Sequence, residues 1–306
     1  MTDHFADRLL DAIEKKGSPI CVGIDPVYEM LPDAVAGSAA ERDPHDVEAC
    51  VDAIFDFTVE LLRIVAPIVP CVKFQSAYFE KYLWEGVQAY YELIHEAREM
   101  GFVVIGDVKR GDIGSTSEAY ASAHLSEIDF EGIDEAATPD AITVNAFLGL
   151  DSIEPFVNAA REAGKGLFVL ARTSNPGSAD LQDAKSIDGR TFSEMLADKL
   201  QTVAEAPGMV GRSGWSALGA VVGATQAHTM TSLRERLPRS IFLLPGYGTQ
   251  GATAEMTRAA FRDGKGAVVS ASRSILYAHQ KRPGTSWEDA IARAVEGMRS
   301  DVRSIV

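Results

Sequence analysis

A run of alternating charges, Asp107-Val108-Lys109-Arg110-Gly111-Asp112, follows a short apolar stretch near the middle of the chain. Alternate side chains of an extended strand share one face, so Asp107 and Lys109 are expected to point the same way as the apolar side chains of Val103 and Ile105. Fixed opposite charges at such a point can stabilise charge that develops on a substrate, or deliver a proton to it. The alternative is a strand that ends in an ordinary surface ion pair, which contributes little to stability.

Two other apolar runs also end in an ionisable side chain. Lys73 lies near the end of Cys71-Val72-Lys73-Phe74-Gln75, and Asp25 follows Val22-Gly23-Ile24. Three such strand ends are harder to explain by chance than one. If neighbouring strands run parallel, we expect Lys73 to lie close to Asp107, with Asp25 completing a charged cluster.

A different set of residues points to phosphate binding. The segment 243–251 is rich in glycine and includes Gln250, and the apolar run 267–271 leads directly into Ser272 and Arg273. Backbone N–H groups of such loops commonly bind phosphate after the seventh and eighth strands of a barrel. The alternative is a pair of flexible turns with a surface arginine.

The elements that would position these residues alternate along the chain. Near-continuous apolar strands, each followed by an amphipathic helix, are typical of a parallel sheet covered by helices. Strands are predicted at 19–25, 71–75, 102–107, 141–147, 167–173, 217–224, 241–245 and 267–271. Helices are predicted near 47–65, 80–100, 116–128, 151–163, 191–205, 227–236, 253–263 and 287–303.

Eight such units favour an α/β fold of the (β/α)8 TIM barrel type, as a single domain over 1–306. The alternative is an open sheet with fewer strands. Long loops are predicted at 27–46 and 174–190. Both follow the C-terminal end of a strand, which is where barrel active sites form.

Composition narrows the class of partner. The 306 residues carry a net charge of −15, which repels nucleic acids and anionic membranes, so an anionic substrate needs a local concentration of Lys and Arg. No apolar run reaches about 18 residues, and the N-terminus lacks the layout of a signal peptide, so we expect a cytoplasmic protein.

The three cysteines, Cys21, Cys50 and Cys71, form no Cys-x-x-Cys pair and are expected to be buried free thiols. The six scattered histidines predict no metal site.

Taken together, these residues resemble the orotidine 5'-phosphate decarboxylase family, in its longer-chain bacterial form. The Asp-x-Lys-x-x-Asp signature stands as Asp107, Lys109 and Asp112, and it extends through Thr116. The resemblance covers about residues 19 to 278. Further positions that match the family are Asp25, Lys73, Ser174, Gln250, Ser272 and Arg273.

The resemblance implies a carboxy-lyase that converts orotidine 5'-monophosphate to UMP and CO2, with neither metal nor cofactor. It further implies that Lys109 donates a proton to C6, while Lys73 and Asp25 contact the ribose. Ser174 would lie on the base side, and Gln250 and Arg273 would bind the phosphate as the loop at 245–252 closes.

The resemblance also implies a homodimer in which Asp112 and Thr116 reach into the partner's active site. An alternative is a metal-assisted sugar-phosphate enzyme, such as 3-keto-gulonate-phosphate decarboxylase or hexulose-phosphate synthase. These enzymes share the signature, but they carry an acidic residue where this chain has Lys73, which argues against this alternative. A catalytically silent nucleotide-binding barrel is a further alternative. The sequence assigns no role to Arg110, Gln75 or Asn145.

Overall fold

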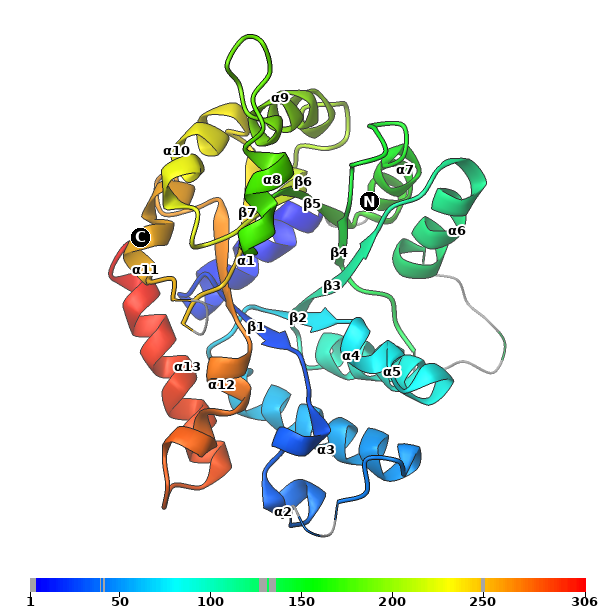
Figure 1. Ribbon diagram of the computed structural model, residues 1–306, viewed down its shortest axis with the longest axis vertical. Coiled ribbons are helices and arrows are strands. Elements are labelled where there is room, and N and C mark those ends of the chain that lie inside the picture. Colours follow the sequence, from blue (N-terminus) through cyan, green and yellow to red (C-terminus); the bar gives the residue numbers. More distant parts are fainter. Residues whose placement is uncertain (1–3, 39, 41, 127–130, 132–135, 249–250) are drawn as a thin grey trace.

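The computed structural model describes residues 4–38, 40, 42–126, 131, 136–248 and 251–306. Eight parallel strands pair in chain order and close on themselves, with β1 next to β8, which confirms the predicted (β/α)8 barrel (Figure 1). The strands are β1 (Ile20–Ile24), β2 (Cys71–Gln75), β3 (Val103–Arg110), β4 (Ala141–Val144), β5 (Gly166–Arg172), β6 (Ser216–Val222), β7 (Ser240–Pro245) and β8 (Ala267–Ala271).

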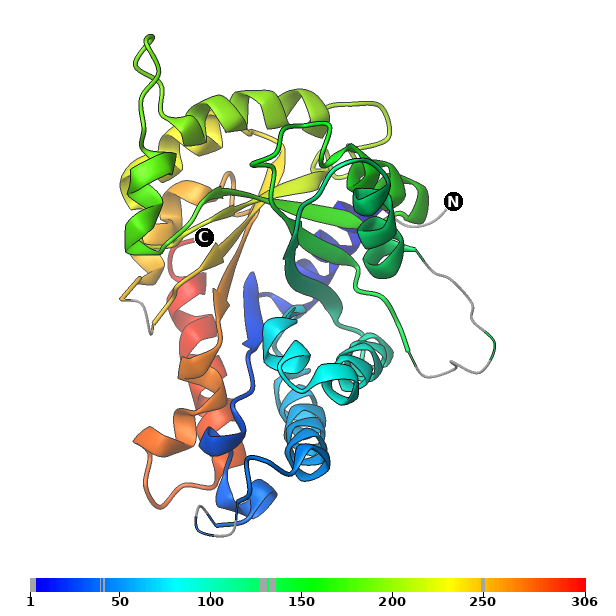
Figure 2. The same ribbon diagram turned by 45° about the vertical axis from the view of Figure 1, so that its right-hand side comes forward.

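Helices surround these strands, as the two ribbon views show (Figures 1 and 2). Because they cover the sheet from outside while side chains fill the barrel from inside, the strands are almost wholly buried. The helices are α1 (Phe5–Lys16), α2 (Asp33–Ala36), α3 (Val47–Val65), α4 (Ala77–Glu80), α5 (Leu83–Glu99), α6 (Gly114–Leu125), α7 (Glu154–Ala163), α8 (Ala179–Gln182), α9 (Phe192–Ala204), α10 (Ala227–Arg236), α11 (Ala254–Thr257), α12 (Arg273–Leu276) and α13 (Trp287–Arg303). Within the described chain, none is both long and apolar enough to cross a membrane.

Helix α1 is an element that the sequence interpretation missed. Its Phe5 ring packs edge-on against Phe168, at a centroid distance of 5.9 Å, and lies directly over Gly166. A side chain at Gly166 would collide with that ring. Because Gly166 begins β5, α1 closes the N-terminal end of the barrel, opposite the strand ends that carry the predicted site.

Strand β3 departs from the predicted regular alternation. It continues to Arg110, and its register with β4 shifts between Gly106 and Arg110. Lys109, within this irregular stretch, has a φ of +46°, which is uncommon for a residue with a side chain. The simple alternation that placed Lys109 beside Asp107 is therefore incomplete, since a local irregularity sets the direction of the lysine. Strand β4 also ends earlier than predicted, at Val144 rather than Phe147.

The two predicted long loops contain short helices. The first holds a 3-10 turn, Tyr28–Met30, and helix α2, and the Arg42 guanidinium donates to backbone carbonyl groups in both parts of it. The second holds a 3-10 turn, Pro176–Ser178, followed by α8. The described parts of both loops therefore contain regular structure rather than extended chain.

Candidate active site

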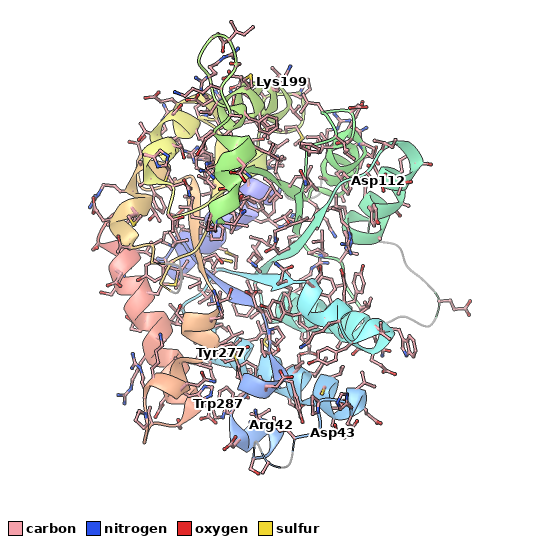
Figure 3. The ribbon with its side chains drawn as sticks, viewed as in Figure 1. Arg42, Asp43, Asp112, Lys199, Tyr277 and Trp287 are labelled. Atoms are coloured by element: carbon pink, nitrogen blue, oxygen red, sulfur yellow. The ribbon has the colours of Figure 1, made fainter. Side chains whose placement is uncertain are left out.

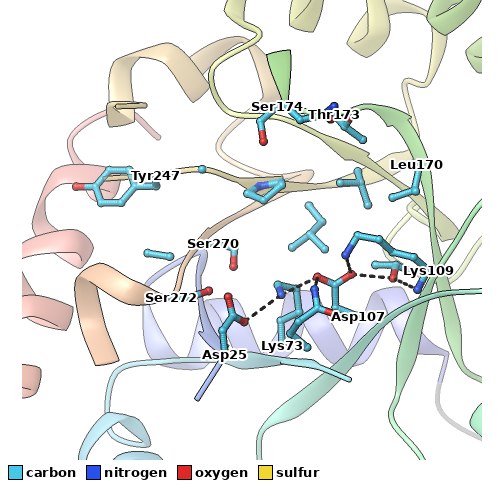
Figure 4. A pocket seen from close by; sticks show the side chains of 18 of the residues that line it. Asp25, Lys73, Asp107, Lys109, Leu170, Thr173, Ser174, Tyr247, Ser270 and Ser272 are labelled. Atoms are coloured by element: carbon cyan, nitrogen blue, oxygen red, sulfur yellow. Dashed lines mark hydrogen bonds and ion pairs between the residues drawn. The ribbon is translucent and has the colours of Figure 1, made fainter. Parts of the chain in front are cut away.

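A cavity of about 520 Å³ opens at the C-terminal ends of the strands, the end where barrel enzymes place their active sites (Figure 4). Its size suits a small organic ligand. The structure brings most of the predicted site residues to this cavity, from the ends of β1, β2, β3, β5 and β8 or from the loops after them. Those residues are Asp25, Lys73, Asp107, Lys109, Ser174, Ser272 and Arg273.

Four of these side chains form a continuous row of alternating charge along one side of the cavity (Figure 4). The Lys73 ammonium lies 3.7 Å from a carboxylate oxygen of Asp25 and 2.8 Å from Oδ2 of Asp107. The Lys109 ammonium lies 2.5 Å from Oδ1 of Asp107. The predicted proximity of Lys73 to Asp107 is therefore confirmed, and strands β1, β2 and β3 supply the whole row.

Burial and charge act in opposite directions on the inner members of this row. Burial alone would lower the pKa of Lys73, but the carboxylates of Asp107 and Asp25 outweigh it and raise that pKa. Burial would raise the pKa of Asp107, but Lys73 and Lys109 outweigh it and hold that pKa well below its usual range. Lys73 and Asp107 are consequently both charged at neutral pH.

Two further side chains hold Asp107, and the sequence interpretation assigned neither. Gln75 donates to Oδ2 of Asp107 at 2.9 Å, and the Thr143 hydroxyl donates to Oδ1 at 2.9 Å. Gln75 shares the end of β2 with Lys73, so its position was a usable signal. Thr143 lies inside the apolar run of β4, where nothing in the sequence distinguishes it from a packing residue. Asp107 thus accepts hydrogen bonds from four side chains, those of Lys73, Gln75, Lys109 and Thr143.

The opposite side of the cavity is built from the loop after β5. Buried Arg172 holds this loop, donating to the Thr173 carbonyl at 2.9 Å and pairing with Asp183 at 2.9 Å. Gly223, just beyond β6, lies against the backbone of Ser174, and a Cβ there would come within 2.9 Å of the Ser174 nitrogen. The contacts of Arg172 and Gly223 together place Ser174 at the cavity wall.

The loops after β7 and β8 form a third part of the cavity, with Gly246, Tyr247, Ser272 and Arg273 in its lining. Arg273 is exposed, and within the described chain it forms no ion pair with a carboxylate. The Tyr247 hydroxyl, by contrast, donates to Asp301 at 2.6 Å. Tyr247 was not predicted as a site residue, and Gln250, which was, lies outside the described residues.

Asp112 and Thr116 do not line this cavity. Asp112 lies two residues before α6, away from the barrel centre (Figure 3), and its carboxylate accepts a hydrogen bond from the Ile113 amide at 2.8 Å. Thr116 is exposed on α6. Large apolar side chains are also exposed on the segments that follow β3 and β4 and at the start of α5. They are Leu83, Trp84, Ile113, Phe147 and Leu148.

The cysteines lie outside the charged row. The three cysteines are buried free thiols, as predicted, with Cys21 and Cys71 paired in register on adjacent strands. Among the described residues, no group of three or more His, Cys, Asp or Glu side chains is arranged to hold a metal ion.

Comparison with known proteins gives consistent results. The family model described as "Orotidine 5'-phosphate decarboxylase / HUMPS family" matches residues 18–287. A Rhodopirellula baltica protein named orotidine 5'-phosphate decarboxylase is 39% identical to this chain, over 98% of this chain and 99% of the relative. A Clostridium acetobutylicum protein of the same name is 38% identical, over 97% of this chain and 98% of the relative. A solved structure from Streptomyces avermitilis matches with a TM-score of 0.80 and 33% identity over 100% of this chain and 97% of its own. The Leishmania donovani OMP decarboxylase structure matches with a TM-score of 0.70 and 28% identity, over 99% of this chain and 98% of its own.

Proposed function

The chain belongs to the orotidine 5'-phosphate decarboxylase / HUMPS family, and from this premise we propose that it is an orotidine 5'-phosphate decarboxylase, converting orotidine 5'-monophosphate to UMP and CO2 in de novo pyrimidine biosynthesis. The observation that carries this proposal is the row Asp25–Lys73–Asp107–Lys109 along one wall of the cavity. A lysine second in that row distinguishes the chain from the sugar-phosphate enzymes, for which an acidic residue is expected at that position.

Loss of CO2 from C6 of the orotate ring leaves a carbanion that no adjacent carbonyl group can delocalise. Its stabilisation must then come from fixed charge in the site. Lys109 is the proposed source of both that charge and the proton that C6 receives, because its ammonium is held at the open end of the row, with a side chain that is 46% exposed. Asp107 is held by four donors, so it can keep the lysine in place while substrate charge changes.

A single lysine is not enough for the reaction. One charge pair at about 4 Å contributes roughly 4 kcal/mol at an effective dielectric constant of 20. Enzymes lower activation barriers by about 8–23 kcal/mol. Binding energy from the distant phosphate must therefore supply part of the difference, by orienting the ring and excluding water.

The remaining side chains are proposed to hold the other parts of the substrate. Asp25 Oδ1 is buried and has no hydrogen-bond partner in the described structure, so it is available to accept a ribose hydroxyl. Lys73 would contact the same ribose, and Ser174 the base. Arg273, together with Ser272 and the undescribed Gln250, would bind the phosphate as the loop at 245–252 closes.

The proposed working unit is a homodimer in which Asp112 and Thr116 enter the partner's active site. Neither lines the cavity of its own chain, although both belong to the signature segment. Exposed apolar side chains beside Asp112, such as Ile113 and Phe147, favour burial against another protein surface. A two-fold dimer would bring this face against its own copy and complete both sites equally.

The chain 1–306 is further proposed to be one domain that acts in the cytoplasm. Its reduced cysteines suit a reducing compartment, and its net charge of −15 disfavours nucleic acid and membrane partners.

One assay tests the activity. The purified protein is mixed with orotidine 5'-monophosphate, and the loss of the substrate's ultraviolet absorbance is followed with and without a chelator. The proposal predicts loss of absorbance and formation of UMP in both cases. A protein that binds the nucleotide without converting it would be a silent barrel, and activity that disappears with the chelator would indicate metal-assisted chemistry.

A further inference from the structure

Thr143 links the two residues on which proton delivery depends. Its side chain is buried, and its hydroxyl makes two hydrogen bonds, accepting from the Lys109 amide at 2.9 Å and donating to Oδ1 of Asp107 at 2.9 Å. A hydroxyl has one proton, and the amide cannot accept it, so the proton must point at the carboxylate. The donor and acceptor roles in both hydrogen bonds of the Thr143 hydroxyl are therefore fixed.

The Lys109 backbone has a conformation that needs such support. Its φ of +46° is shared by few residues with side chains among those described, and it falls where the register of β3 shifts against β4. The next residue is held by another bond to the same neighbouring segment, from the Asn145 amide to the Arg110 carbonyl at 2.8 Å. Thr143 supplies the acceptor for the Lys109 amide itself.

The same hydroxyl also orients the lysine's partner. Lys109 Nζ lies 2.5 Å from Oδ1 of Asp107, the oxygen to which Thr143 donates. Gln75 and Lys73 donate to the other oxygen, whereas the Lys109 amide donates to Thr143. Of the three side chains that donate to Asp107 besides Lys109, only Thr143 is also hydrogen-bonded to Lys109. It therefore contacts both members of the Lys109–Asp107 ion pair.

We propose that Thr143 is a positioning residue that holds the Lys109 backbone and the Asp107 carboxylate so that the ammonium is aimed into the cavity. This inference rests on the proposed role of Lys109 as proton donor. Thr143 acts through its hydroxyl.

The test compares Thr143→Val, which keeps the shape and removes the hydroxyl, with Thr143→Ser, which keeps the hydroxyl. For the valine variant we expect kcat for orotidine 5'-monophosphate to fall roughly 10- to 100-fold, the loss expected for a buried hydrogen bond to a charged group, while KM changes less than about threefold. The serine variant should stay within about threefold of the wild-type kcat.

A local readout separates positioning from general damage. Hydrogen–deuterium exchange at the Lys109 amide should be faster in the valine variant than in wild type, and unchanged in the serine variant, because only valine removes the acceptor. Thermal unfolding monitors the fold of each variant, and Thr143→Ala provides the same loss of hydroxyl if the valine variant does not fold.

Wild-type kcat in the valine variant, or an equal loss of kcat in both variants, would overturn the inference. Lys109→Ala is measured in parallel to keep this result distinct from the proposed function. If that variant still turns over substrate, the role of Lys109 is wrong; if it is inactive while Thr143→Val is fully active, only the positioning role is wrong.

Discussion

The charged row and the end of the cavity that is proposed to bind phosphate are built in contrasting ways. Asp107 and Lys73 project from strands and are buried, and Lys73 and Gln75 both donate hydrogen bonds to Asp107. Tyr247 lies in the loop after β7 and Arg273 is the first residue of the short helix α12; Arg273 is exposed and without a carboxylate partner in the described chain. Under the proposed function, the strands would supply preorganised charge for the chemistry, and the segments after β7 and β8 would supply binding to the phosphate.

The largest effect is expected at the charged row. Lys109→Ala should leave no UMP formation above the buffer rate, because neither the charge nor the proton remains at that position. The fold should be preserved, since Asp107 keeps three other donors and the lysine side chain is 46% exposed. Absorbance assays measure the first effect, and circular dichroism and urea unfolding measure the second. Turnover close to wild type would remove Lys109 from the mechanism.

The second effect tests whether the charged row of one chain also needs Asp112 from a partner chain. Asp112→Asn should lower kcat about 100- to 1,000-fold if the carboxylate enters the partner's site. An equal mixture of Asp112→Asn and Lys109→Ala chains, unfolded and refolded together, should recover about a quarter of the wild-type activity, because half of the dimers are mixed and each has one intact site. Each variant refolded alone is the control. No recovery in the mixture would place Asp112 and Lys109 in the same site of one chain.

A smaller effect is expected at the phosphate end. Arg273→Ala should lower kcat/KM for orotidine 5'-monophosphate about 10- to 100-fold, because a charge-assisted contact with the phosphate is lost. It should have little effect on orotidine, which lacks the phosphate. Arg282→Ala, another exposed arginine that does not line the cavity, serves as the matched control. An equal loss on both substrates would refute the phosphate role.

The same contrast explains how far the sequence could predict the molecule. Strands β2 and β8 and helices α3, α10 and α13 were predicted to the residue, since apolar runs and helical periodicity report burial directly. Lys73 and Asp107 were also paired correctly, because adjacent parallel strands end at the same edge.

What escaped prediction depends on contacts between distant residues. Thr143 becomes distinctive only through its bonds to Lys109 and Asp107, and the positive φ of Lys109 only through the register shift of β3 against β4. Tyr247 likewise can be identified as a residue of the site only because the folded chain places it in the cavity lining. Helix α1 is a different case, because its amphipathic pattern can be recognised from the sequence alone.

The smallest effect concerns stability at low pH. Because its pKa is lowered in the folded protein, Asp107 contributes stability above its ordinary titration range near pH 4, and this contribution is lost as pH falls below that range. Urea unfolding of wild type should therefore show a steeper loss of stability between about pH 5 and pH 2 than Asp107→Asn does. Parallel curves for the two proteins would mean that Asp107 does not titrate as the charged row requires.

The most direct test of the central claim restores the charge at one position by chemistry. Lys109→Cys should be inactive, and alkylation with bromoethylamine should return an ammonium group to nearly the position that the lysine occupied. The partly exposed site is open to the reagent, while Cys21, Cys50 and Cys71 are all buried, and the treated Lys109→Ala protein is the control. The proposed mechanism predicts that UMP formation returns in step with modification measured by mass spectrometry. Complete modification of the introduced thiol without any return of activity, in a protein that remains folded, would contradict it.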